Sequence, residues 1–147
     1  MHQFQYTINN QDGTATLGLF LGDTYVTQYS YENGFVTLSA RSSKDTGSVA
    51  EIQENVNLIG RWINNIHSSL SPTNIKRNNF KENIEKTNTG LVGKFTCGVD
   101  FGKVVFNLDE QTLEFDARPS VVLNFNDFQG WHQFLNRMIS ESVRFNG

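Results

Sequence analysis

The sequence predicts an α+β fold in which two meandering antiparallel four-stranded units are each followed by one helix (ββββα-ββββα), with the helices packed on the sheet. Three observations lead to this prediction. Short alternating segments are separated by tight turns, each half of the chain closes with one amphipathic helical pattern, and the two helical patterns share an apolar spacing. That spacing reads Ile59-x-x-Trp62-Ile63-Asn64-x-Ile66 in the first helix and Trp131-x-x-Phe134-Leu135-Asn136-x-Met138 in the second.

Length and composition indicate one folded domain. A chain of 147 residues is long enough to bury one core, and charged residues at 18% with hydrophobic residues at 37% are typical of an ordinary soluble protein. We therefore expect a single domain over residues 1–147, made of a pseudo-repeat (1–70 and 91–147) and a linker at 71–90.

Four strands are predicted in the first half. Residues 3–8 alternate with Phe4, Tyr6 and Ile8 on one side, and further strands are expected at 15–21, 25–31 and 35–40. The last two are joined by Asn33-Gly34, a pair that tolerates the positive φ of a type I′ hairpin turn. Together the four segments form a meander.

The first helix is predicted from an apolar stripe and from its ends. Ser48 and Glu51 have the spacing of a capping box, and Ser71-Pro72 ends the pattern. The stripe repeats at spacings of three and four through Val49, Ile52, Val56, Ile59, Ile63, Ile66 and Leu70.

The second half is expected to repeat the plan after residues 71–90, which lack strand alternation and are interpreted as a short helix or a linker. Strands are predicted at 91–99, 103–108, 112–117 and 120–125, followed by a helix capped by Asn126 or Asp127. Three glycines within strands, Gly18, Gly93 and Gly98, are interpreted as bulges or as points of close backbone approach.

No pattern for catalysis, for a metal or for a cofactor is found. The only cysteine, Cys97, is assigned to packing, and no His-x-x-x-His pair, phosphate loop, dinucleotide fingerprint or nucleophile elbow occurs. The start lacks the features of a signal peptide and no apolar run reaches membrane-spanning length. We therefore expect a cytoplasmic protein that is not an enzyme, has no cofactor and does not enter a membrane.

Two groups of residues are candidates for binding a partner. Tyr25, Tyr29 and Tyr31 are expected on one side of a strand, where they would anchor a macromolecule, unless they pack beneath a helix. Lys76, Arg77 and Lys81 surround Phe80 in a small basic segment that suits a phosphate backbone, and the alternative is a solvated linker.

These observations favour a non-catalytic protein that binds and occludes a protein partner, as an inhibitor, immunity protein or anti-defence factor does. The formal net charge of −3 fits a basic partner better than a phosphate backbone. The alternative is a single-stranded nucleic-acid-binding protein, because four strands and a helix, doubled, are similar in element order to the Whirly and PUR-type proteins. An exposed edge strand on either sheet also offers a route to a homodimer.

Overall fold

The computed structural model describes residues 2–9, 12–21, 24–40, 44–72, 80–97, 100–117 and 120–145. The first half of the chain contains five strands and one helix, namely β1 (His2–Asn9), β2 (Thr14–Leu21), β3 (Thr24–Glu32), β4 (Phe35–Ala40), β5 (Lys44–Ser48) and α1 (Val49–Leu70). The second half repeats this order with β6 (Lys81–Lys86), β7 (Gly90–Cys97), β8 (Asp100–Asn107), β9 (Thr112–Ala117), β10 (Ser120–Asn124) and α2 (Phe125–Arg144).

The two halves exchange strands. The first sheet has the order β1-β2-β3-β4-β10 and the second has the order β5-β9-β8-β7-β6, and every pairing is antiparallel. Each sheet is therefore a four-stranded meander from one half, completed at its edge by the fifth strand of the other half. Because of this exchange, each half supplies backbone hydrogen bonds that the other half needs.

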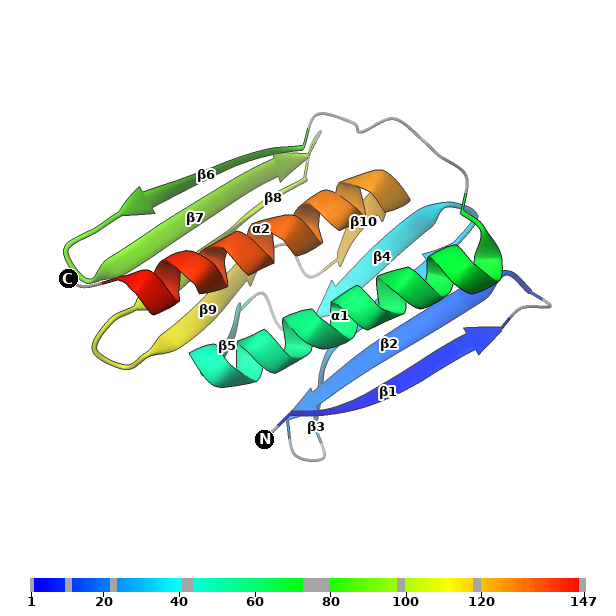
Figure 1. Cartoon of the computed structure of the whole chain (residues 1–147), viewed down its shortest axis with the longest axis horizontal. Helices are drawn as coiled ribbons and strands as arrows, with labels where there is room; N and C mark the ends of the chain where they lie inside the picture. The colour runs from blue at the N-terminus through cyan, green and yellow to red at the C-terminus, as the bar shows by residue number, and fades with distance from the viewer. Residues whose placement is uncertain are drawn as a thin grey trace.

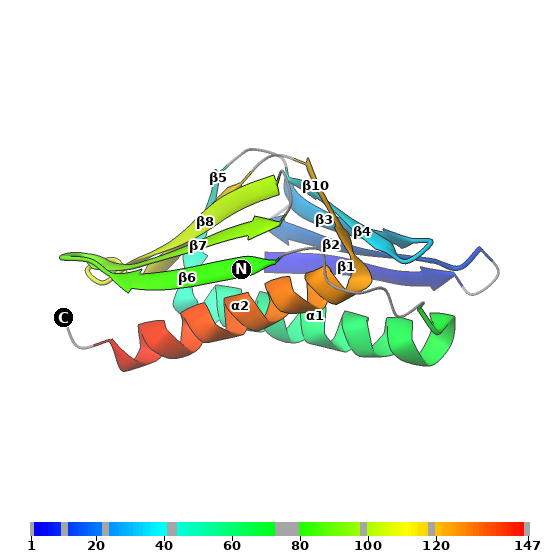
Figure 2. The same ribbon diagram turned by 90° about the horizontal axis from the view of Figure 1, so that it is seen from above.

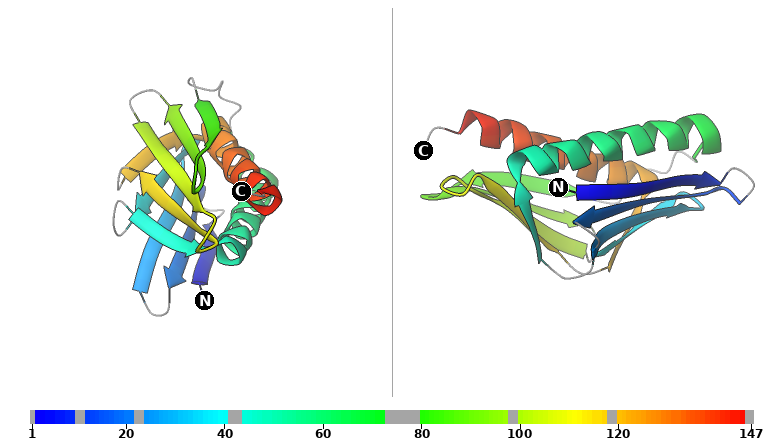
Figure 3. Two further views of the ribbon diagram at one scale, coloured as in Figure 1. Left: turned by 90° about the vertical axis from the view of Figure 1, so that its left-hand side faces the viewer. Right: turned by 90° about the horizontal axis from the view of Figure 1, so that it is seen from below.

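The two helices lie side by side and run in opposite directions over the inner faces of both sheets (Figure 1). The sheets are inclined to one another and meet along a crest on the side away from the helices, as Figure 2 and the right-hand view of Figure 3 show. One face of each sheet therefore packs against helices, and neither described helix covers its other face (Figures 2 and 3).

The core fills the space between the helices and the inner faces of the sheets. Its largest fully buried side chains are aromatic, and they come from both helices and from β8 (Trp62, Phe106, Phe125, Phe128 and Phe134).

Gly93 lets α2 approach β7 closely, because a Cβ atom there would lie 2.5 Å from Met138 Sδ and 2.9 Å from the Phe134 ring. The predicted close approach is confirmed at Gly93. The bulge of the first sheet begins one residue after Gly18, and Gly98 lies outside the described residues.

Local sequence signals account for how the helices start. In α1 the Ser48 Oγ accepts from the Glu51 amide at 3.1 Å while Glu51 Oε1 accepts from the Ser48 amide at 3.2 Å, which confirms the predicted capping box. The start of α2 differs from the prediction of Asn126 or Asp127 as cap. Asn124 is the cap, and its Oδ1 accepts from the Asp127 amide at 2.8 Å.

The hairpin prediction is confirmed, because Asn33 and Gly34 have φ values of 52° and 85°. The α+β class with antiparallel sheets is also confirmed. The repeat of four strands and a helix is matched only loosely, since each half contains five strands.

Three differences explain this. The prediction missed β5, whose sequence Lys-Asp-Thr-Gly-Ser has no apolar alternation. Part of the predicted linker at 71–90 is wrong, because residues 81–86 form the edge strand β6. Finally, β10 pairs with β4 of the first half instead of extending the meander of its own half.

In the part of the chain that the structure describes, no helix is both long enough and apolar enough to span a bilayer.

Candidate functional site

The outer faces of the two sheets, which the two helices do not cover, are candidate surfaces for a partner (Figures 2 and 3). Strand β7 shows how the faces are divided, because buried Phe95 and Cys97 alternate with exposed Lys94 and Thr96. The buried residues face the helices and the exposed residues face away from them. The same alternation continues in β8, where exposed Lys103 precedes buried Val104.

The described part of the outer face of the first sheet has an apolar pair with uncharged polar residues and one acidic residue around it. Phe35 on β4 is 47% exposed and Val122 on β10 is 53% exposed. Phe35 lies between buried Gly34 and Val36, and Val122 lies between Val121 and Leu123, which are 2% and 3% exposed. Phe35 is opposite Asn124 and Val122 is opposite Thr37, so the two apolar side chains are diagonal neighbours on paired strands. The half-exposed residues around them are uncharged (Thr16, Gln28, Ser30, Thr37 and Ser39).

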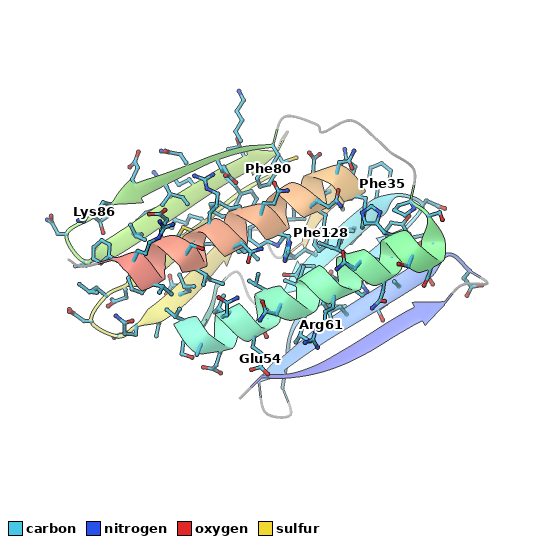
Figure 4. All side chains as sticks on the ribbon, viewed as in Figure 1. Phe35, Glu54, Arg61, Phe80, Lys86 and Phe128 are labelled. Atoms are coloured by element: carbon cyan, nitrogen blue, oxygen red, sulfur yellow. The ribbon has the colours of Figure 1, made fainter. Side chains whose placement is uncertain are left out.

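One acidic residue lies beside this pair. Exposed Glu32 on β3 is directly opposite Phe35 in the register of β3 and β4. We call Phe35, Val122 and Glu32 the anchor patch. Figure 4 shows Phe35 at the end of the molecule where α1 ends and α2 begins.

The outer face of the second sheet is different because it carries lysines. Lys94 and Lys103 occupy directly opposite positions on β7 and β8, and Asn83 of β6 is opposite Lys94 on the other side. Lys81 lies two residues before Asn83, opposite Thr96. Lys81, Lys94 and Lys103 are all exposed, and we call them the lysine cluster.

The structure corrects the expectation that the tyrosines of β3 form an exposed platform. Tyr29 and Tyr31 are only 4% and 5% exposed, so they belong to the core. The Tyr29 ring lies 6.1 Å from Trp62 and 5.4 Å from Phe128, and the Tyr31 ring meets the Phe125 ring edge-on at 5.6 Å. Burial raises the pKa of the Tyr31 hydroxyl, and a hydrogen bond with the Gly34 backbone opposes that shift.

Tyr25 does not continue the row of Tyr29 and Tyr31 in a regular register. The bulge between Leu19 and Phe20 pairs Thr27 with Leu19 but Tyr25 with Phe20, which breaks the alternation on which the expectation depended. The side chain of Tyr25 lies outside the described residues, and so do Lys76 and Arg77. Lys81 is the one predicted contact residue that the structure places on an outer face.

Two histidines connect the helices. His132 Nε2 lies 3.0 Å from the Val56 carbonyl oxygen, and it is close enough to α1 that a Cβ atom at Gly60 would lie 3.2 Å from it. Burial lowers the pKa of His132, and the hydrogen bond to Val56 opposes that shift. His67 contacts Gln129 through Nε2 at 2.8 Å and meets the Phe125 ring edge-on. Both histidines therefore connect the two helices.

One shallow hollow lies where α2 ends over the second sheet. It is lined by Ile84, Lys86, Leu91, Glu141, Arg144 and Phe145, and the Lys86 amine lies 5.0 Å from the centre of the Phe145 ring. Among the described residues, no group of three or more His, Cys, Asp or Glu side chains is arranged to hold a metal ion.

Comparisons with protein-family models, with curated proteins and with solved structures found no match.

Sequence reasoning missed four residues of these surfaces, namely Phe35, Val122, Lys94 and Lys103. Strand alternation contains no signal for Phe35, which precedes Val36, or for Val122, which lies between Val121 and Leu123. It contains a signal for Lys94 and Lys103, since each precedes a buried apolar residue. The signal becomes readable only once the sheet register shows which face the helices cover.

Proposed function

We propose that this chain is a non-catalytic protein that binds a protein partner through the outer face of the first sheet and blocks that partner by occlusion. The observation that supports this proposal is the anchor patch. Two neighbouring apolar side chains there are about half exposed, and the only other large hydrophobic residue with high exposure in the described chain is Val143, at 71%. An inhibitor, an immunity protein or an anti-defence factor acts in this way.

The composition of the face fits a protein interface. Such interfaces place aromatic and aliphatic anchors at the centre and hydrogen-bonding groups around them. Phe35 supplies the anchor, and the surrounding hydroxyl and amide groups on β2, β3 and β4 provide donors and acceptors. Glu32 beside Phe35 and the net charge of −3 favour a partner with a basic group next to an apolar pocket.

Site-specific photo-crosslinking tests this proposal. A photoreactive phenylalanine analogue replaces Phe35 in the cells that produce the protein, and the matched control carries the analogue at Val143, which is also apolar and exposed but lies on α2. We expect a discrete protein adduct at position 35 that is missing at position 143. Equal capture at both positions, or no protein adduct at position 35, would contradict the proposal.

A second variant tests the chemistry of the anchor. Replacing both Phe35 and Val122 with serine should weaken binding of the crosslinked partner at least tenfold, because truncated anchor residues typically cost about 1–4 kcal/mol. The thermal midpoint should change little, because both side chains are largely outside the core. Unchanged binding by a folded variant would show that the partner docks elsewhere.

A further inference from the structure

The second sheet bears a basic cluster on the outer face that the proposed protein interface does not use. Lys81, Lys94 and Lys103 come from three adjacent strands, β6, β7 and β8. Neighbouring strands are about 4.8 Å apart, so the three positions extend across about 10 Å of the sheet. Exposed Asn83 and Thr96 lie between the lysines and add neutral hydrogen-bonding groups.

The arrangement of these lysines is electrostatically unfavourable in the free protein. Like charges at directly opposite positions of an antiparallel pair repel one another, and Lys94 is directly opposite Lys103. Among the side chains that the structure describes, none pairs with the amine of Lys81, Lys94 or Lys103. Asp116 is opposite Lys103 on β9 by register, but it is also opposite Lys44 on β5, so this row holds three lysines and one aspartate.

Two other carboxylates of the same face, Glu85 and Glu114, lie in a different row of the sheet. Glu85 is opposite Val92, Val92 is opposite Val105, and Val105 is opposite Glu114, so these four residues form one row across the sheet. This row is two residues along the strands from the row of Lys94 and Lys103, on the side away from Lys81 and Thr96. Separation of charge along the strands leaves a local positive region on a chain whose net charge is −3. A local region of this kind attracts polyanions even when the whole molecule is acidic.

We propose that the lysine cluster on the outer face of the second sheet binds the phosphate backbone of a single-stranded nucleic acid. Three point charges on adjacent strands suit the repeating phosphates of such a strand, and exposed amines bind them with little desolvation cost. A duplex fits less well, because the major groove is about 12 Å wide and admits a helix or a two-stranded ribbon, whereas a five-stranded face is about 19 Å wide. This inference is independent of the proposed protein interface, which lies on the other sheet.

The salt dependence of binding gives the proposal a quantitative form. Each phosphate contact on a single strand contributes about −0.7 to the slope of log affinity against log salt concentration. Three contacts give a slope of about −2, which corresponds to about a 20-fold loss of affinity between 50 and 200 mM salt. Removal of two lysines should reduce this loss to about threefold.

The experiment measures fluorescence anisotropy of a labelled 20-nucleotide single-stranded DNA of mixed sequence, titrated with the full chain at several salt concentrations. The test variant is K94Q/K103Q, which changes two exposed side chains. The control is K86Q, because Lys86 lies on β6 like Lys81 but is opposite buried Leu91 and is near the far end of that strand (Figure 4). Circular dichroism and the thermal midpoint confirm that each variant is folded.

The proposal expects wild type and K86Q to share the slope of about −2, and K94Q/K103Q to have a slope of about −0.7. No binding by wild type at 50 mM salt would overturn it, and so would a slope that the double substitution leaves unchanged. Poly-glutamate competes as the protein-like polyanion. If poly-glutamate displaces the DNA as effectively as unlabelled oligonucleotide at the same concentration of negative charge, the surface fits an acidic protein and the nucleic-acid assignment is wrong. Crosslinking at Phe35 is unaffected by any of these outcomes, so failure here is distinguishable from failure of the protein interface.

Discussion

Replacing Tyr29 with serine should lower the stability of the fold, because this side chain belongs to the core and not to a binding surface. The Tyr29 ring is 4% exposed and contacts Trp62 of α1 and Phe128 of α2, so it joins the first sheet to both helices. Removing a buried aromatic ring costs about 3–5 kcal/mol, because apolar contact is lost and a cavity remains. In a chain of this length such a loss lowers the thermal midpoint by about 10–15 °C.

The assay is urea and thermal unfolding followed by circular dichroism, with Phe35→Ser as the matched control. Phe35 is an aromatic residue on the neighbouring strand of the same sheet, but it is 47% exposed and faces away from the helices. Its replacement should change the unfolding free energy by less than about 1 kcal/mol. A Tyr29→Ser variant that unfolds at the same midpoint as wild type would refute the assignment of Tyr29 to the core.

Two further predictions concern contacts of α2. Burial lowers the pKa of His132 in the folded protein below the ordinary value of 6.5. As the pH falls below 6.5, the unfolded chain therefore gains a proton at this histidine before the folded chain does. The unfolding free energy should then decrease as the pH drops from 7.5 towards the folded pKa. The difference in unfolding free energy between pH 7.5 and pH 5.5 should therefore be smaller for His132→Gln than for wild type, and an equal difference would contradict the role of His132. Gly93→Ala should lower the unfolding free energy by about 1–3 kcal/mol, because its Cβ would lie 2.5 Å from Met138 Sδ. Thr96→Ala on the outer face of the same strand is the control and should be nearly neutral, so equal effects of the two changes would argue against close packing at Gly93.

The elements that could be predicted from the sequence are those whose signals are local. The capping box at Ser48 depends on contacts within four residues, and the turn at Asn33-Gly34 depends on two φ angles. Strands β5 and β6 were missed because both are edge strands whose sequences lack an apolar alternation. In β6 only Ile84 packs partly against the core, and the rest of the strand consists of charged residues and one asparagine.

The exchange of β5 and β10 could not be predicted for a different reason. A strand's periodicity shows that it has two faces, but it does not identify its neighbour in the sheet. In β10 (Ser120–Asn124), the same side chains could face the core whether the strand paired with β9 or with β4. The choice depends on where the chain can cross from one sheet to the other, which is a property of the assembled molecule.

The candidate site was harder to predict, because it depends on which face of each sheet the helices cover. Alternation placed Tyr29 and Tyr31 on one side of β3 correctly, yet both helices cover that side. Phe35 and Lys94 follow the same rule on the opposite side, and they became visible only with the sheet register. An aromatic residue in a strand is therefore ambiguous until the position of the helices is known, and this ambiguity accounts for the wrong assignment.

The division between inner and outer faces also explains how one fold can present two unlike surfaces. Folding of each half depends on the inner face, where the helices pack, and on the backbone pairing of the exchanged strands. Outer-face residues such as Phe35 and Lys94 contribute little to either, so they can differ between the halves at little cost in stability. The first sheet exposes an apolar pair beside one acid, and the second exposes three lysines, although both sheets have the same five-stranded plan. A repeated fold with a shared core thus allows the outer faces of the two sheets to differ in chemistry.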